Sequence, residues 1–289
     1  MAPSGANISG VDMADIKTID GIAANVVWTE ELDVDFTSLS TQSFDHDDTF
    51  DLGGATWLVQ ESDGSSTRGT IAAEAGSGIK ITPASSGTNI YTGVDVPLVS
   101  TKLADVCSSL SDDDIICVQF FIDEAVAIAA NYDGYGGLIY EQSADGSLED
   151  VTTWLQYSNF YYSAYSGRAI KVGSASYTEA IAAATTTYAP TIFEMVYNFG
   201  PSYGICAAST STSTDPAPFS ADLDPTYCTT ATANLPIRNG SFTAPTRGIS
   251  ASEARCGFGS FKVSSPTAFY VFLKRIRILR AGGSGGGLG

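Results

Sequence analysis

An alternation of apolar and polar residues with a period of two is the feature that most constrains this chain. Between residues 26 and 36 the apolar residues share one face of an extended strand: Val26, Trp28, Leu32, Val34 and Phe36. Acidic residues occupy the opposite face, and Glu30 interrupts the apolar one. Because successive side chains of a strand point to opposite sides, the pattern predicts a half-buried strand with an acidic outer face.

Similar patterns recur in short segments, separated by Asp-Gly, Asn-Gly and Gly-Pro pairs that favour turns. Further strands are expected at Thr56–Gln60, Gly78–Thr82, Ile90–Leu98, Ile115–Ile122, Gly137–Glu141, Thr153–Tyr157, Phe160–Tyr165, Ala169–Val172, Thr191–Phe199, Tyr203–Ala208, Gly257–Val263 and Ala268–Arg280. Many short strands with turns between them indicate an all-β fold, a β-sandwich or jelly roll.

Three segments depart from the simple alternation of apolar and polar residues. Ile115–Ile122 is apolar on both faces, which is typical of a central strand. Ser176–Thr185 is rich in alanine and ends before Pro190, so a short helix is expected there. Asp12 could cap a single helical turn over Met13–Thr18.

The sequence predicts three segments: an arm for attachment or oligomerisation (residues 1–25), a sandwich domain (26–280) and a Gly-rich tail (281–289). In the arm, Ile8-Ser9-Gly10-Val11 is followed by the similar Ile19-Asp20-Gly21-Ile22. Two units are too few for a solenoid, and chance similarity is the alternative. Our hypothesis is that apolar arm residues pack against a neighbouring subunit, namely Ile8, Val11, Ile16, Ile19 and Ile22.

The charge balance excludes some partners. The 32 acidic and 14 basic residues give a net charge of −18. This charge repels phosphate backbones, so no nucleic-acid partner is expected. Solubility is the simplest interpretation; spacing of many copies on a crowded surface and attraction of divalent cations are alternatives. No apolar stretch approaches the roughly 20 residues of a membrane span, and the first residues do not resemble a secretory signal; no membrane partner is expected.

Five cysteines are spread along the chain without a Cys-x-x-Cys pair: Cys107, Cys117, Cys206, Cys228 and Cys256. The spacing does not fit a zinc site. Reduced, buried thiols in a protein made in a cytosol are expected. A Cys206–Cys228 disulfide across the Ser/Thr-rich segment is the alternative.

The sequence offers little support for nucleophilic or acid–base catalysis, and no catalytic residue is expected. His46, the single histidine, lies among aspartates in what we interpret as a solvated acidic loop. The Gly-x-Ser-x-Gly string at Gly200–Gly204 joins two expected strands, whereas a nucleophile elbow needs a helix after its serine.

Metal binding stays open, although no cofactor is expected. Asp45, Asp47 and Asp48, the run Asp112–Asp114, and Asp133 or Asp145 supply oxygen ligands of the kind that calcium prefers. None of these groups follows the spacing of an EF-hand. Exposed acidic turns are therefore the favoured interpretation.

Tyrosines concentrate between residues 132 and 165. The residues considered for a glycan or protein contact are Trp154, Tyr157, Tyr161 and Tyr162, because aromatic rings stack on sugars and are enriched at interfaces. Core packing is the simpler alternative.

A strip of basic residues lies on the last expected strand: Lys274, Arg275, Arg277 and Arg280. Pairing with acidic residues of neighbouring strands is slightly favoured. The alternative is a docking strip for an acidic partner. The side-chain period also slips near Lys274–Ile276, which predicts a bulge.

Two resemblances bear on identity. The arm sequence ISGVDMADIKTIDGIA is similar to short segments common at the start of phage tail and particle proteins, where they serve attachment or oligomerisation. The strands Phe193–Phe199 and Tyr203–Ala208 and the closing run LKRIRILR resemble the concanavalin A-like lectin/glucanase sandwich, over Val26–Arg280.

The second resemblance implies a test for glycosidase activity. Retaining members of the laminarinase group carry a Glu-x-Asp-x-x-Glu strand, whose outer glutamates act as nucleophile and acid/base. Glu31 and Asp33 match the first two positions, but Phe36 stands at the third. Asp35 cannot replace it, because a shift of one residue points to the other face of the strand.

Together these observations predict a non-enzymatic structural protein of a virion, a capsid decoration (cement) or tail-associated subunit made in the host cytoplasm. The expected partners are copies of itself, by analogy as a trimer, and major capsid or tail proteins. The alternative is a carbohydrate-binding, lectin-like adhesion module with a host glycan as its ligand. A glycosidase is the remaining alternative.

Overall fold

A computed structural model describes residues 7–8, 11–12, 28–60, 69–84, 97–124, 134–142, 148–162, 165–174, 177–184, 192–199, 203–209, 234–237, 250–261 and 270–281. The strands are β1 (Asn7–Ile8), β2 (Val11–Asp12), β3 (Trp28–Asp35), β4 (Gln42–Ser43), β5 (Thr49–Leu52), β6 (Ala55–Gln60), β7 (Gly69–Glu74), β8 (Gly78–Pro83), β9 (Leu98–Lys102), β10 (Ile115–Glu124), β11 (Gly134–Gln142), β12 (Leu148–Tyr162), β13 (Tyr165–Ser174), β14 (Tyr177–Ala184), β15 (Ile192–Asn198), β16 (Tyr203–Ser209), β17 (Asn234–Ile237), β18 (Ala254–Phe261) and β19 (Val271–Ala281). A 3-10 turn, η2 (Phe36–Ser38), and a helical turn, α1 (Leu103–Val106), complete the described elements.

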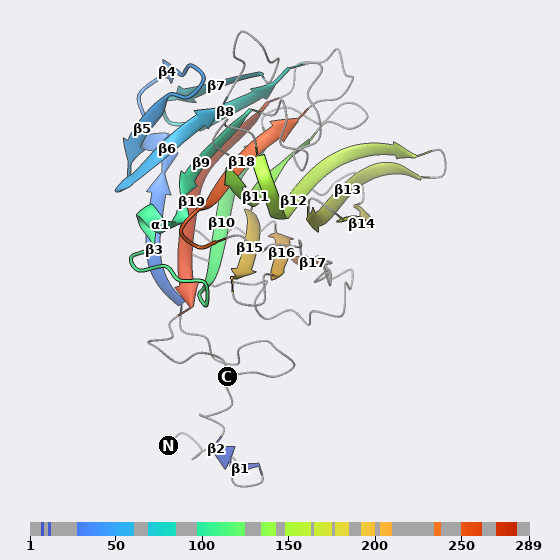
Figure 1. The fold of residues 1–289 in the computed structure, drawn as a ribbon. Coiled ribbons are helices and arrows are strands. Elements are labelled where there is room, and N and C mark those ends of the chain that lie inside the picture. Colours follow the sequence, from blue (N-terminus) through green and yellow to red (C-terminus); the bar gives the residue numbers. More distant parts are fainter. Residues whose placement is uncertain are drawn as a thin grey trace, which may run out of the picture.

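Two antiparallel sheets form a sandwich (Figure 1). Sheet I has the order β17-β16-β15-β10-β19-β8-β7-β4, with β3 also paired to β19. Sheet II has the order β14-β13-β12-β11-β18-β9-β6-β5. Strands β1 and β2 form a two-stranded sheet of their own. The prediction of an all-β sandwich is confirmed.

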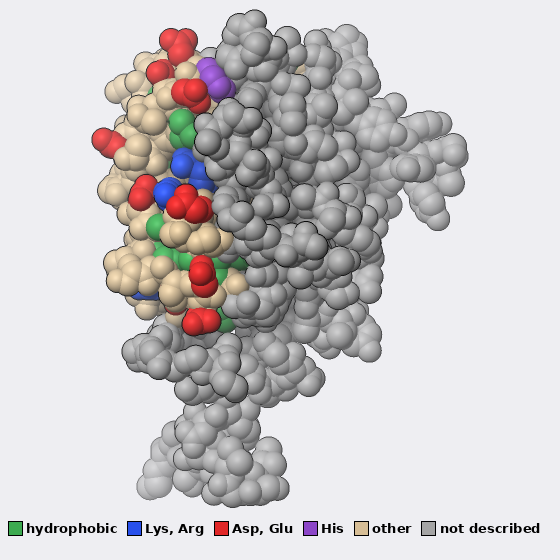
Figure 2. Space-filling view, viewed as in Figure 1, with side chains coloured by type: hydrophobic (Ala, Val, Ile, Leu, Met, Phe, Trp, Pro, Cys, Tyr) green, Lys and Arg blue, Asp and Glu red, His purple; other side chains and the backbone are tan. Residues whose placement is uncertain are grey.

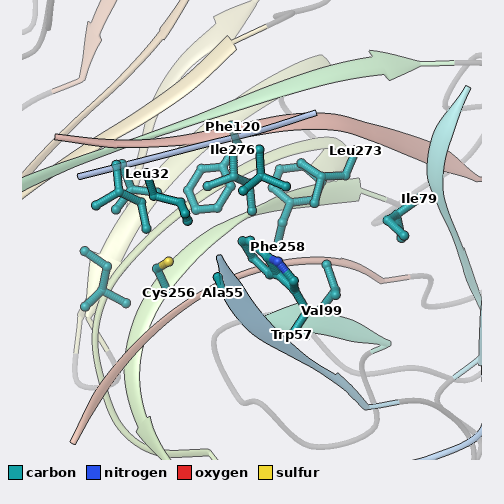
Figure 3. Packing of buried hydrophobic residues seen from close by; sticks show 14 of the residues in the cluster. Leu32, Ala55, Trp57, Ile79, Val99, Phe120, Cys256, Phe258, Leu273 and Ile276 are labelled. Atoms are coloured by element: carbon teal, nitrogen blue, oxygen red, sulfur yellow. The ribbon is translucent and has the colours of Figure 1, made fainter. Parts of the chain in front are cut away.

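The hydrophobic core lies between sheets I and II. Figure 3 shows Phe120 and Ile276 of sheet I facing Phe258 and Trp57 of sheet II, and all four are fully buried. The rings of Phe120 and Phe258 lie 5.4 Å apart. Gly137 leaves room for this contact, because a Cβ atom there would lie only 2.4 Å from Cε2 of Phe120.

Several strand predictions are confirmed in detail. Strand β10 lies between β15 and β19, as its two apolar faces indicated. The pairing of β10 with β19 shifts register between Phe121 and Ile122, opposite the predicted bulge near Lys274–Ile276. Alternate residues of β15 and the following turn enter the core: Phe193, Met195, Tyr197 and Phe199.

The predicted helix at Ser176–Thr185 is wrong, because Tyr177–Ala184 forms the edge strand β14 paired with β13. Backbone pairing with a neighbouring strand outweighs the high intrinsic helix propensity of an alanine-rich segment, because propensity amounts to less than about 1 kcal/mol per residue. The expected strands Thr153–Tyr157 and Phe160–Tyr165 also needed correction: residues 148–162 form one long strand, β12.

For two further predictions, the structure describes only some of the residues concerned. Asp12, expected to cap a helical turn, lies in β2, and residues 13–18 fall outside the described part. Of the strand expected at Ile90–Leu98, residues 90–96 fall outside it too, whereas β9 begins at Leu98. Strand β7 and turn α1 were not anticipated.

The first long strand changes face near its start. Leu32 and Val34 enter the core as predicted. Trp28 was expected on the same face but packs against a separate cluster with Cys117, Val196 and Leu279. The pairing of β3 with β19 shifts register between Ile278 and Leu279, and this irregularity turns the beginning of β3 over.

Candidate functional site

Two arginines of β19 are paired with acidic side chains of β3. Arg275 donates hydrogen bonds from Nε and Nη2 to the two carboxylate oxygens of Asp33, and its guanidinium lies 4.9 Å from the ring centre of Phe121. Arg277 pairs with Glu30 at 2.6 Å. Two positions of the predicted basic strip are therefore already compensated within the chain.

Lys274 pairs with Asp123 at 2.7 Å, with side-chain exposures of 41% and 54%. Figure 2 shows acidic side chains spread over the described part of one face, with a few basic ones among them. The structure agrees with the favoured interpretation of these basic residues, as outward-facing charges paired with acidic neighbours. Docking of an acidic partner along the strip stays a prediction.

Arg280, the last of the basic residues, connects three segments. One nitrogen, Nη2, lies 2.7 Å from Oε1 of Glu31 on β3. The other, Nη1, donates a hydrogen bond of 2.7 Å to the carbonyl oxygen of Ser108 and lies 3.9 Å from Oδ2 of Asp114. This guanidinium thereby holds the loop between α1 and β10 against β3 and β19.

Trp28 and Ala281 are register partners at the ends of β3 and β19. Strand β3 therefore begins and β19 ends at the same end of the sandwich, which we call the exit end. The described residues at the exit end include Trp28 and Ile115, both half-buried against the cluster of Cys117, Val196 and Leu279. None of these contacts was predicted, because they join positions far apart in the sequence.

The segment that resembles a glycosidase strand has a structural role. Glu31 and Asp33 are held by Arg280 and Arg275. Phe36, at the position of the third catalytic residue, is fully buried in the core. The three positions therefore do not form the pair of free carboxyl groups that glycoside hydrolysis needs.

His46 lies in an acidic turn between β4 and β5. Its Nε2 is 3.4 Å from Oδ1 of Asp47, and the backbone N–H of Asp45 donates to Oδ2 of Asp48 at 2.7 Å. Asp47 adopts a φ of 64°, which aspartate tolerates better than most residues. The turn is stabilised by its own side chains, as expected for a solvated acidic loop.

Carboxylates of the run Asp112–Asp114 cap backbone groups. Asp112 accepts a hydrogen bond from the N–H of Ala251 at 2.7 Å, and Asp114 accepts one from the N–H of Ser111 at 2.8 Å. Within the described residues, no group of three His, Cys, Asp or Glu side chains could hold a metal ion. Asp133 and Asp145 lie outside those residues, and calcium binding by them stays a hypothesis.

The aromatic residues of the predicted contact site lie on one strand of sheet II. Trp154, Tyr157, Tyr161 and Tyr162 all belong to β12, which pairs with β11 and β13. Their side chains fall outside the described part of the structure. Tyr135 of the same tyrosine-rich region is fully buried in the core, which fits the core-packing alternative at that position.

A buried polar cluster on sheet II was not anticipated from the sequence. The hydroxyl of Tyr140 donates to Oγ of Ser100 at 2.8 Å, and Nε of Arg255 donates to the same Oγ at 3.2 Å. Burial raises the pKa of Tyr140, although the nearby Arg255 acts to lower it. Strand pairing alone brings these distant positions together, so no local sequence signal could reveal them.

Sheet I carries a second buried polar pair that the sequence did not reveal. Nε2 of Gln119 donates to Oε2 of Glu194 at 2.7 Å, and both residues are fully buried. They are register partners on β10 and β15, and they alternate with core residues along these strands. The alternation places them on the face of sheet I that is turned away from the core.

Cys107, Cys117 and Cys256 are free and buried, as predicted. Burial raises the pKa of Cys107 and of Cys256 to about 12 and also raises that of Cys117. Thiols are the form that burial favours, since the thiolate would have to lose its hydration. The proposed Cys206–Cys228 disulfide lies outside the described side chains.

These thiols should resist alkylation at pH 8 in the native protein. With a pKa near 12, the thiolate fraction of Cys107 and Cys256 is on the order of a thousandfold below that of an ordinary cysteine. A C206S/C228S variant should therefore react with maleimide only after addition of denaturant. Rapid reaction of the folded variant would contradict the burial of these thiols.

The same pKa shifts predict a loss of stability in alkali. The pKa of Cys107 and of Cys256 in the folded protein lies above the value of about 8.5 in the unfolded chain. Below pH 8.5 both thiols are neutral in either state, so their contribution to the free energy of unfolding is complete there. It falls as the pH rises toward about 12, the folded-state pKa of Cys107 and Cys256. Denaturant titrations over this range, compared with a C107A/C256A variant, measure the contribution.

No protein-family model and no curated protein matches the chain. Among solved structures, the GH43 protein BlXynB from Bacillus licheniformis has a TM-score of 0.46 at 11% identity, over 89% of this chain and 40% of that chain. A mutant of it gives the same TM-score at 10% identity. The lectin from Bauhinia forficata in complex with GalNAc has a TM-score of 0.38 at 8% identity, over 83% of this chain and 98% of that chain.

The chain thus spans 40% of the length of the first two structures. Similarity at this level does not transfer an activity to this chain. Within the described residues, no helix is long and apolar enough to cross a membrane. The chain is a two-sheet, antiparallel β-sandwich in which three arginines of β19 pair with acidic side chains of β3.

Proposed function

We propose that the chain is a non-enzymatic structural subunit of a bacteriophage particle, a capsid decoration (cement) or tail-associated protein. Its arm attaches the sandwich to neighbouring subunits, as copies of itself in a trimer and as major capsid or tail proteins. The protein is made in the host cytoplasm and works on the virion. The sequence of the arm, with its repeated apolar residues and its resemblance to phage particle proteins, supports this assignment.

The observation that carries the proposal is the separate β1–β2 sheet. Ile8 and Val11 are register partners in this short hairpin, which forms its own two-stranded sheet. An isolated two-stranded hairpin is marginally stable in water. A hairpin that carries apolar residues beyond a completed sandwich therefore needs a surface to pack against, and an adjoining subunit supplies one.

The charged groups support a structural role over an enzymatic one. The carboxylates that resemble part of a glycosidase motif are bound to arginines, and the third position is a core phenylalanine. Carboxyl groups that act in catalysis need access to the substrate. In this chain the same groups join β3 to β19.

Deletion of Met1–Ala24 should abolish incorporation into the particle while the sandwich stays folded. The deletion removes the apolar arm residues but stops before β3, so the melting temperature should change by only a few degrees. Incorporation is measured by mass spectrometry of purified particles, with the full chain as reference. A truncated chain that is incorporated at normal copy number would refute the arm model.

A carbohydrate-binding module is the second candidate, supported by the position of the aromatic residues. Trp154, Tyr157 and Tyr161 share β12 of sheet II, and aromatic rings stack on sugar faces. A glycan array would distinguish the candidates: selective binding that Tyr161→Ala abolishes favours the module. Tyr270→Ala, which changes a half-buried ring next to β19, is the control. Sugar binding without turnover would separate such a module from a glycosidase.

A further inference from the structure

We draw no further inference here: the strongest candidate, the polar cluster of Ser100, Tyr140 and Arg255 on the face of sheet II turned away from the core, carries nothing, because its hydroxyl and guanidinium groups already bond to one another and nothing in the structure shows what covers it.

Discussion

Replacement of Trp57 by alanine is expected to lower the free energy of unfolding by about 3–5 kcal/mol, the range for deletion of a fully buried aromatic side chain. Trp57 is completely buried, and its ring meets that of Phe36 edge-on with centroids 4.9 Å apart. Its Nε1 donates to the carbonyl oxygen of Leu52 at 3.1 Å. Truncation therefore leaves a cavity between the sheets and removes a donor from the β5–β6 turn.

Trp57→Phe is the matched control. It retains much of the buried apolar area but loses the hydrogen bond to Leu52, so a cost of about 1–2 kcal/mol is expected. Chemical denaturation with circular dichroism measures both changes; the alanine variant should also melt roughly 10 °C lower. Costs of similar size for both variants would mean that the hydrogen bond, and not the packing of the ring, dominates.

The core around Trp57 was predictable because its strands follow a local rule. Leu32, Val34 and Phe36 alternate with acidic residues, and the structure buries all three. Ile115–Ile122, apolar on both faces, is central as expected. In both cases the spacing of apolar residues within one short segment determines which side chains are buried, so the sequence pattern alone predicts the burial.

The failures have a different physical origin. Tyr177–Ala184 is a strand because β13 offers a hydrogen-bonding edge, a condition that its composition does not encode. Trp28 changes face because one irregularity in the β3–β19 pairing reverses the alternation. Both outcomes depend on a partner strand that is distant along the chain.

The candidate sites likewise divide into residues that the sequence could identify and contacts between distant strands that it could not. The basic residues of β19 were found from their composition, and their pairing with acidic strands was the favoured interpretation, but their partners could not be named. Arg275 meets Asp33 across 242 positions. The cluster of Ser100, Tyr140 and Arg255 gave no signal at all, because each residue is unremarkable in its own strand.

Replacement of Arg280 by alanine should destabilise the protein by about 2 kcal/mol, less than the 3–5 kcal/mol for breaking a fully buried ion pair. The side chain of Glu31 is only 11% exposed and would lose its partner at 2.7 Å. The carbonyl oxygen of Ser108 would lose its donor as well. Lys274→Ala is the matched control: its pair with Asp123 is 41% and 54% exposed, so at most about 0.5 kcal/mol is expected.

Two further variants identify the source of the Arg280 effect. Arg280→Lys keeps the charge but cannot hold Glu31 and the Ser108 carbonyl together, since an ammonium group lacks the fork of a guanidinium; an intermediate loss is expected. In a double-mutant cycle, Arg280→Ala and Glu31→Gln should be coupled by at least about 1 kcal/mol. If Arg280→Ala costs no more than Lys274→Ala, then this network does not hold the loop between α1 and β10 in place.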